Sequence, residues 1–389
     1  MLKYYSFLFI LFFEVLSAQN LKIKIVDSEN LKAINNARVL VGNKVFYTND
    51  DGFAIVPERI EGGEVSAPNF QTQKFEKPGS EIRLKPVYKL IDEVKIVSVD
   101  IREIFENVLK DYGKIYYDKP SIYDVVYKQK NFYDNTLAFL VIADAKLWTK
   151  TNQYNFKYGL KKEYDEILQM QLNTIKYLKT TNKDTLLTGR TNEFSHEIIG
   201  NFFFNYELSR LIGILKSDNN KNFGTLIYQE GSFQMISFKI KKLDGTNISG
   251  EFTYDTLNKA ISRFKISYDQ TEFPILKKKS VDGRAFDYKM GIASMIFDFY
   301  LKDGKYIPSQ YNFEGDNFLI IIDGQKHLKK FSRQITYNTF NPSNGDQLNP
   351  RIDFTKDFWE NVPNNEQKPS TVILSEEEAN FLNISGNEK

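Results

Sequence analysis

The sequence predicts a mainly β protein, a small β-sandwich followed by an α+β domain built on a large curved antiparallel sheet with a few helices. Three observations predict this class. Short alternating apolar and polar runs fill residues 21–84, long hairpin-like runs fill residues 233–337, and helical periods are confined to a few segments. A hydrophobic fraction of 41% in 389 residues supplies enough apolar side chains for packed cores.

Residues 1–19 have the composition of a secretory signal peptide. Lys3 precedes the apolar run 7–16, and Ser17 and Ala18 supply small residues before Gln19. The run is too short to span a bilayer, and no later segment is as apolar over the necessary length. We therefore expect an exported protein, either periplasmic or associated with an outer membrane.

The overall composition excludes several classes of protein. The 52 Lys and Arg residues nearly balance the 50 Asp and Glu residues, so the chain has no basic excess for a dedicated nucleic-acid surface. The chain contains no cysteine, which excludes disulfides, thiol chemistry and a lipid-modified cysteine. Both predicted domains must therefore be stabilised by their own cores.

Residues 20–97 are expected to form the β-sandwich. The segment 21–27 alternates apolar residues with lysines, as a half-buried strand does. Further strand-like runs follow, separated by glycine-containing turns, and no helical period interrupts them. These runs are residues 37–43, 44–48, 53–57 and 81–86.

The acidic turn 49–52, Asn-Asp-Asp-Gly, is the most conspicuous local signal in this domain. An EF-hand would need further oxygen ligands where Phe53 and Ile55 stand, so a calcium loop is not expected. A β-turn fits better, with Gly52 at positive φ, Asp50 or Asp51 capping the turn, and Phe53 in the core.

Residues 98–340 are expected to form the curved-sheet domain, which begins with a helix. Ile101, Phe105 and Val108 recur at helical spacing, Asp100 and Glu103 resemble a capping box, and Gly113 is a helix stop signal. A second short helix is expected over 206–215, and residues 165–178 fit a strand or a helix.

The rest of this domain has the pattern of successive long hairpins. Strands are expected on either side of turns at Asp303-Gly304 and Asp323-Gly324, and the runs 233–241 and 260–269 alternate in the same way. The tail, residues 341–389, is expected to be extended and to end in a short helix with Ser375 and Glu378 as its capping box.

The sequence offers little catalytic material. His196 stands between Ser195 and Glu197, but adjacency does not make a triad, and His327 is expected to be an exposed residue at a strand start. No phosphate-binding, nucleophile-elbow or zinc motif is present. We therefore predict no catalytic, cofactor-binding or metal-binding residue and no cofactor, leave the ligand-binding residues unassigned, and regard a hydrolase using scattered carboxylates as a remote alternative.

The N-terminal module resembles the carboxypeptidase regulatory-like domain, a transthyretin-like β-sandwich found at the start of TonB-dependent receptors. The resemblance is carried by Thr48, Asp51, Gly52 and Phe53 together with the runs 23–27, 34–41 and 82–86. The whole chain resembles secreted envelope proteins that contain this domain. The hairpins of residues 98–340 resemble the half-barrel of LolA-like lipoprotein carriers, which implies a curved sheet around an apolar cavity.

Two functional hypotheses follow. In the first, a non-enzymatic envelope protein binds a lipid or an acyl chain in the cavity of the curved sheet, since its many aromatic residues, 32 Phe and 23 Tyr, suit an apolar site. In the second, the protein is an envelope scaffold that docks on protein partners through the N-terminal sandwich, and both cores are solid.

Overall fold

The computed structural model describes residues 20–57, 62–77, 79–87, 97–181, 199–217, 223–280, 283–353 and 372–383. The chain divides into two compact units, one made of residues 1–88 and 369–389 and the other of residues 89–368. The described part of the first unit therefore combines residues 20–87 with residues 372–383. The expected signal peptide lies outside the described residues.

The first unit is a small β-sandwich, as the alternation predicted. In spatial order, one sheet is β4 (Phe53–Pro57), β1 (Asn20–Asp27) and β7 (Glu81–Leu84), and the other is β3 (Lys44–Tyr47), β2 (Arg38–Val41), β5 (Gly63–Ser66) and β6 (Gln73–Phe75). Ile23, Ala54 and Leu84 from the first sheet pack against Val39 and Val65 from the second. This shared apolar core makes the two sheets one folding unit.

The acidic turn is a structural corner whose details differ from the prediction. Gly52 has a φ of +79°, as expected. The turn is capped by Asn49 rather than by Asp50 or Asp51, because Asn49 Oδ1 accepts the N–H groups of Asp51 at 3.1 Å and of Phe53 at 2.9 Å. The prediction that Phe53 is in the core is wrong, since inward and outward side chains alternate and the buried neighbour is Ala54.

A substitution at Gly52 is expected to destabilise the first unit. In Gly52→Ala the new Cβ would lie 2.8 Å from the Ile25 carbonyl oxygen and 3.0 Å from Ala33 Cβ, in addition to the unfavourable φ. The left-handed conformation alone costs roughly 1–2 kcal/mol for an L-residue. Gly42→Ala is the matched control, since Gly42 also has positive φ but its Cβ would meet nothing within 4 Å. Chemical denaturation should show a clearly larger loss for Gly52→Ala, and equal losses would contradict the close approach.

The C-terminal segment 372–383 belongs to this first unit and ends in α8 (Glu376–Leu382). The capping box between Ser375 and Glu378 is present, as predicted. The acidic turn holds this segment, because Asn49 Nδ2 donates to the Leu374 carbonyl at 3.1 Å and Asp51 Oδ2 accepts the Glu376 N–H at 2.9 Å. The side chains of the acidic turn therefore attach residues 372–383 to the N-terminal sandwich.

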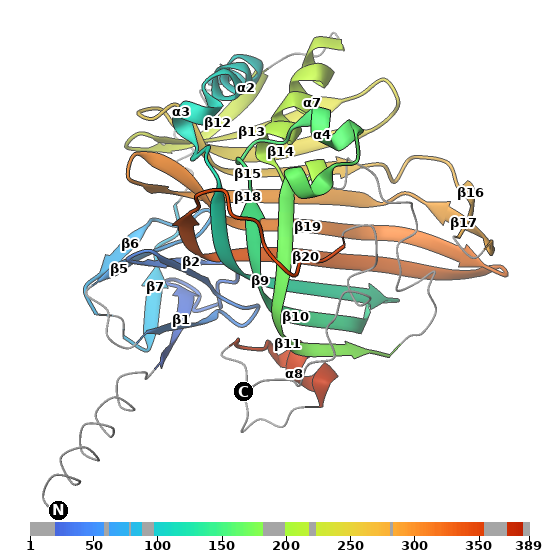
Figure 1. The fold of residues 1–389 in the computed structure, drawn as a ribbon, viewed down its shortest axis with the longest axis horizontal. Coiled ribbons are helices and arrows are strands. Elements are labelled where there is room, and N and C mark those ends of the chain that lie inside the picture. The colour runs from blue at the N-terminus through green and yellow to red at the C-terminus, as the bar shows by residue number, and fades with distance from the viewer. Residues whose placement is uncertain are drawn as a thin grey trace, which may run out of the picture. The chain divides into compact units, whose positions relative to one another are not determined.

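The second unit is built on one large, open antiparallel sheet (Figure 1). From edge to edge its strands are β11 (Leu168–Thr180), β10 (Thr136–Thr149), β9 (Ser121–Tyr133), β20 (Gln325–Pro342), β19 (Lys305–Ile322), β18 (Ile292–Lys302), β15 (Ala260–Asp269), β14 (Asn247–Asp255), β13 (Phe233–Lys241), β12 (Phe223–Glu230) and β8 (Ser98–Asp100). A side hairpin on β19 consists of β16 (Leu276–Lys279) and β17 (Ala285–Lys289). Register shifts in several strand pairs bend the strands locally.

The predicted hairpins are confirmed. β18 and β19 join at Asp303-Gly304, and β19 and β20 join at Asp323-Gly324. Residues 165–178, which fitted either a strand or a helix, contain the start of β11. The sheet also contains non-sequential pairs, since β20 pairs with β9 and β15 pairs with β18.

Among its described residues, this unit contains the helices α2 (Ile101–Lys110), α3 (Tyr112–Ile115), α4 (Phe156–Leu160) and α7 (Phe204–Ser217), with the short 3-10 turn η1 (Tyr164–Glu166). Asp100 caps α2 by accepting the Glu103 N–H, which is the N-cap half of the predicted capping box. Gly113 does not end a helix, because α2 ends at Lys110 and Gly113 lies inside α3. Figure 1 shows α2, α3, α4 and α7 gathered at the end of the sheet formed by β12 to β15.

An aromatic core lies between these helices and the sheet. Phe105 of α2 contacts Phe238, Phe252 and Phe264 at ring-centroid distances of 5.9, 5.3 and 5.9 Å. These three rings come from neighbouring strands, with Phe252 opposite Phe264 and Phe238 opposite Gly250, and they form one apolar surface. The helical face that the sequence predicted is therefore the face that α2 buries.

Candidate functional site

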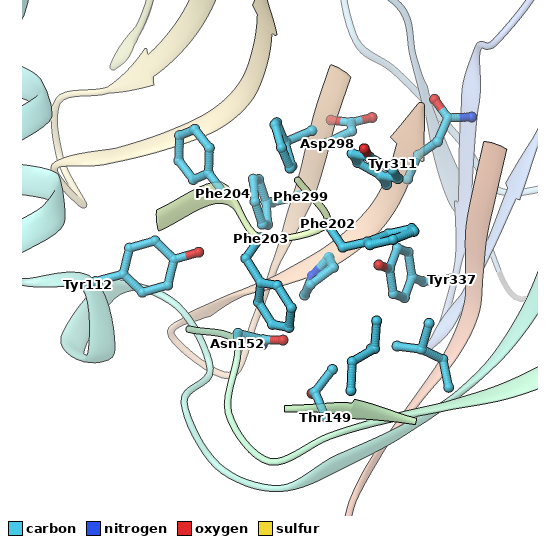
Figure 2. Close-up of a pocket in the computed structure, with 15 residues that line it drawn as sticks. Tyr112, Thr149, Asn152, Phe202, Phe203, Phe204, Asp298, Phe299, Tyr311 and Tyr337 are labelled. Carbon is cyan, nitrogen blue, oxygen red and sulfur yellow. The ribbon is translucent and has the colours of Figure 1, made fainter. Parts of the chain in front are cut away.

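The candidate site is the aromatic-lined space next to this core, between the N-terminal end of α7 and β10, β18, β19 and β20. The cavity that remains there has a volume of about 30 Å³. Figure 2 shows the side chains around it. It is lined by Tyr112, Leu147, Thr149, Asn152, Leu168, Phe202, Phe203, Phe204, Phe297, Asp298, Phe299, Pro308, Gln310, Tyr311 and Tyr337.

Three consecutive phenylalanines fill most of this space. Phe204, the first residue of α7, lies deepest, with ring centroids 5.3 Å from Phe264 and 5.5 Å from Phe297. Phe202 packs 5.1 Å from Tyr311, on the side of the sheet. Phe203 is buried, at 4% exposure, and is directed toward the loop before α4. Adjacent residues can point in three directions because the chain turns tightly here, with the Phe203 N–H donating to the Gly200 carbonyl at 2.8 Å.

The loop that leads into α4 covers this phenylalanine cluster. Tyr154 packs 6.0 Å from Phe203 and 5.0 Å from Tyr206, and Phe156 packs 5.4 Å from Tyr206. The side-chain amide of Asn205 accepts the Tyr154 N–H at 2.8 Å and donates to the Tyr154 carbonyl at 3.4 Å. We call residues 152–160 the lid, because they are joined to α7 at this amide and lie beside the cavity.

The outer surface of the lid carries two apolar side chains beside the exposed Asn155 and Lys157. Phe156 is 45% exposed and Leu160 is 70% exposed, and their spacing of four places both on one side of α4. An isolated exposed apolar residue needs no explanation, but a pair next to an aromatic-lined cavity is suited to contact with an apolar molecule. The lid therefore presents apolar surface both to the cavity and to the solvent.

Within the lid, Gly159 allows α4 to pack closely against Tyr154. A Cβ at this position would lie 1.8 Å from the Tyr154 hydroxyl oxygen, so Gly159→Ala must push the tyrosine ring out of its contacts with Phe203 and Tyr206. We expect proteolysis within the lid to become several times faster. Gly213→Ala in α7, where a Cβ would meet nothing within 4 Å, is the control and should leave the rate unchanged. An unchanged rate for Gly159→Ala would contradict the packing of the lid.

The polar groups at the cavity are few, and one of them, Asp298, is a carboxylate that pairs with Arg263 at 3.4 Å. Burial raises the pKa of Tyr112, Tyr311 and Tyr337 above the usual range of a phenol, so these hydroxyl groups stay protonated. Thr149 Oγ1 is buried beside the cavity without a hydrogen-bond partner among the described residues. A lining that is mostly aromatic, with a few polar groups, is typical of sites for apolar molecules.

A buried ionic cluster holds α7 against the sheet. Glu207 is fully buried, pairs with Arg210 one turn later and accepts a hydrogen bond from the Tyr268 hydroxyl on β15. The Arg210 guanidinium also lies 4.7 Å from the centre of the Tyr268 ring. Burial raises the pKa of the Glu207 carboxyl, against the opposing influence of Arg210 and Tyr268. The cluster positions the helix that begins with the phenylalanines.

The cavity is too small to hold a lipid-sized ligand as it stands. A space of about 30 Å³ has room for about one water molecule, whereas sites for lipid-sized ligands occupy roughly 300–1,000 Å³. The curved-sheet cavity that the sequence led us to expect is filled at this position by the protein's own rings. An acyl chain can enter only if Phe202 and Phe203 move.

Of the two histidines considered from the sequence, His327 is the one that the structure describes. His196 falls outside the described residues, together with Ser195 and Glu197. His327 stands at the start of β20, partly buried, with Nδ1 3.3 Å from Asp134 Oδ2. Among the described residues no group of three or more His, Asp or Glu side chains is placed to hold a metal ion.

Sequence reasoning missed the phenylalanine cluster. The run Asn-Phe-Phe-Phe-Asn at residues 201–205 stands directly before the predicted helix. Three adjacent phenylalanines cannot all face one side of a helix. They therefore indicate a turn at which side chains that point in different directions are all buried. That signal could have identified the site.

Comparisons with known proteins give no family assignment. No family model and no curated protein matches the chain. Of the solved structures, a LolA-superfamily protein from Nitrosomonas europaea aligns at 10% identity and a TM-score of 0.21, covering 64% of this chain and 96% of its own. A DUF1329 family protein from Desulfovibrio piger aligns at 7% identity and a TM-score of 0.20, with the same coverage. A Bacteroides fragilis protein of unknown function, described as membrane-associated, covers 83% of this chain at 10% identity and a TM-score of 0.15.

TM-scores this low carry no functional argument, so a function has to be inferred from the residues of this chain. The carboxypeptidase regulatory-like assignment of the first unit stays a prediction. None of the described helices is both long and apolar enough to cross a membrane.

Proposed function

We propose that this chain is a non-enzymatic cell-envelope protein whose second unit binds an apolar ligand, a lipid or an acyl chain, between α7 and the sheet. The observation that carries the proposal is the phenylalanine cluster. Phe202 and Phe203 stand on a turn outside the helix and occupy the space where a ligand would contact Tyr311 and Tyr337. The protein's own rings take the place of the ligand until the ligand displaces them.

The exchange is energetically balanced because it replaces one apolar contact with another. Moving the two rings outward exposes apolar area, at about 25 cal/mol for each Å². An acyl chain that enters the same space covers the aromatic walls again and regains a similar amount. The anchored part of the helix need not move, since Phe204 and the cluster of Glu207, Arg210 and Tyr268 hold α7 further along.

The two exposed apolar side chains of the lid support the same function. Phe156 and Leu160 would contact a membrane surface or a carried lipid before the lid opens. The aromatic lining around Tyr311 and Tyr337, whose hydroxyl groups stay protonated, suits a hydrocarbon rather than a charged headgroup, which would remain near the lid. Export to the envelope is part of the proposal and is supported by the composition of residues 1–19.

A scaffold that docks on envelope proteins through the N-terminal sandwich is the second candidate. The small volume of the cavity favours it, because a permanently filled interior needs no ligand. In that case the exposed apolar residues of the lid would belong to a protein contact.

Native mass spectrometry of the protein purified from its own envelope separates the two candidates. We expect co-purifying lipid at up to one molecule per chain and saturable binding of cis-parinaric acid, a fluorescent fatty acid. Absence of both lipid and probe binding would eliminate the proposed function and leave the scaffold.

A further inference from the structure

A second groove lies in the other unit, on the outer face of the three-stranded sheet. It has a volume of about 450 Å³, within the range of roughly 300–1,000 Å³ that is usual for small-molecule sites. One wall is the sheet and the other is the C-terminal segment that the acidic turn holds. The groove is lined by Lys22, Lys24, Ala33, Asp50, Asp51, Phe53, Ile373, Leu374 and Glu376.

The floor of the groove is an aromatic ring under two ammonium groups. Lys24 pairs with Phe53 across β1 and β4, and Lys22 lies two residues earlier on the same face. The Lys22 and Lys24 nitrogens lie 4.2 and 5.3 Å from the centre of the Phe53 ring. Two ammonium groups gathered over one ring repel each other, so a negative group between them would be favoured.

The opposite wall carries negative charge that does not neutralise these lysines. Asp51 is engaged with the Glu376 backbone N–H, and the Glu376 side chain is exposed at the rim. Within the described part of the chain, neither Lys22 nor Lys24 forms an ion pair, although three carboxylates line the same groove. A groove that carries charges of both signs suits a ligand that carries both charges.

We propose that this groove binds a small zwitterion with an apolar body, a short peptide with free ends or an apolar amino acid. The ligand's carboxylate would lie between Lys22 and Lys24, and its ammonium group would face Glu376. Its apolar part would cover Phe53 and contact Ile373. This site is separate from the proposed apolar-ligand site, since its lining residues all belong to the first unit.

Calorimetry on the full chain with the dipeptide Leu-Phe tests this assignment. We expect saturable binding, weakened at least tenfold by N-acetylation and at least tenfold by C-amidation, because each change removes one charge. Equal affinity for the free and doubly blocked peptides would overturn the proposal, and so would the absence of binding at millimolar peptide.

Variants assign the two charges to residues. The double substitution Lys22→Gln with Lys24→Gln should abolish the preference for a free carboxylate and keep the preference for a free amine, while Glu376→Gln should do the reverse. Lys44→Gln, an exposed lysine on β3 of the other sheet, is the control and should change neither. If Lys44→Gln weakens binding as much as the groove substitutions do, the effect is general electrostatics and the assignment fails.

The same preparations distinguish this proposal from the apolar-ligand function. Binding of cis-parinaric acid should be equal in the wild type and in the variants at Lys22, Lys24 and Glu376. A loss of probe binding in these variants would contradict the separation of the two sites.

Discussion

Arg210→Met is expected to lower the free energy of unfolding of the second unit by about 3 kcal/mol. The substitution leaves the fully buried Glu207 without its cation, and breaking a buried pair from one side typically costs about 3–5 kcal/mol. The lower end applies because the Arg210 side chain is 35% exposed, so water already screens part of the interaction. Urea denaturation measures the loss directly.

The loss should also depend on pH. Burial already raises the Glu207 pKa above its ordinary value of 4.5, and removal of Arg210 removes an influence that lowers it. A raised pKa in the folded state means that the folded protein holds the proton more tightly than the unfolded chain does, so stability falls as pH rises from about 4.5 toward the folded pKa. The deficit of Arg210→Met should therefore be smaller in acid than at neutral pH.

The double substitution Glu207→Gln with Arg210→Met is the control for this cluster. It removes both charges, and we expect it to recover at least half of the stability lost in Arg210→Met. No recovery would show that Arg210 acts by packing on Tyr268 rather than by compensating a buried charge.

Phe204→Ala is expected to cost about 3–5 kcal/mol, as large-to-small changes at fully buried aromatic positions do. Phe204 is 2% exposed and contacts the rings of Phe264, Phe297 and Phe299 at 5.3, 5.5 and 5.5 Å. Phe223→Ala is the matched control, since Phe223 is 54% exposed, and we expect a change within about 0.5 kcal/mol. Comparable losses for the two variants would contradict the role of Phe204 as the anchor of α7.

The sequence predicted those strands, helices and turns whose formation depends on residues close together in the chain. The alternation of Phe264 and Ile266 with Lys265 predicted the inward face of β15, and the spacing of Leu208, Leu211 and Leu215 predicted the buried face of α7. Turns at Asp303-Gly304 and Asp323-Gly324 were predicted because aspartate and glycine tolerate positive φ.

Features that depend on distant partners were not predictable. The pairing of β20 with β9 joins residues some two hundred positions apart in the chain, for example Phe331 with Asn131. The attachment of residues 372–383 to the acidic turn likewise depends on Asp51 and Glu376, which are far apart in sequence. Phe53 was assigned to the core from its type, whereas its strand position turns it outward under Lys22.

The site itself was missed for a related reason. Phe202 and Phe203 belong neither to a strand nor to a helix, so no period describes them, and their burial depends on the turn at Gly200 and on the lid. Aromatic composition indicated an apolar ligand in general terms. It could not show that the protein's own side chains occupy the space.

The affinity of Phe203→Ala for cis-parinaric acid tests the central claim most directly. If Phe203 competes with the ligand, its removal should enlarge the cavity, lower the stability of the fold and tighten probe binding by at least severalfold. The control is Phe286→Ala in the separate apolar cluster around Phe318 and Ile320, which should lower stability and leave the affinity unchanged. Weaker or unchanged probe binding in Phe203→Ala would contradict the account, because a ring that competes with the probe for one space must raise the affinity when it is removed.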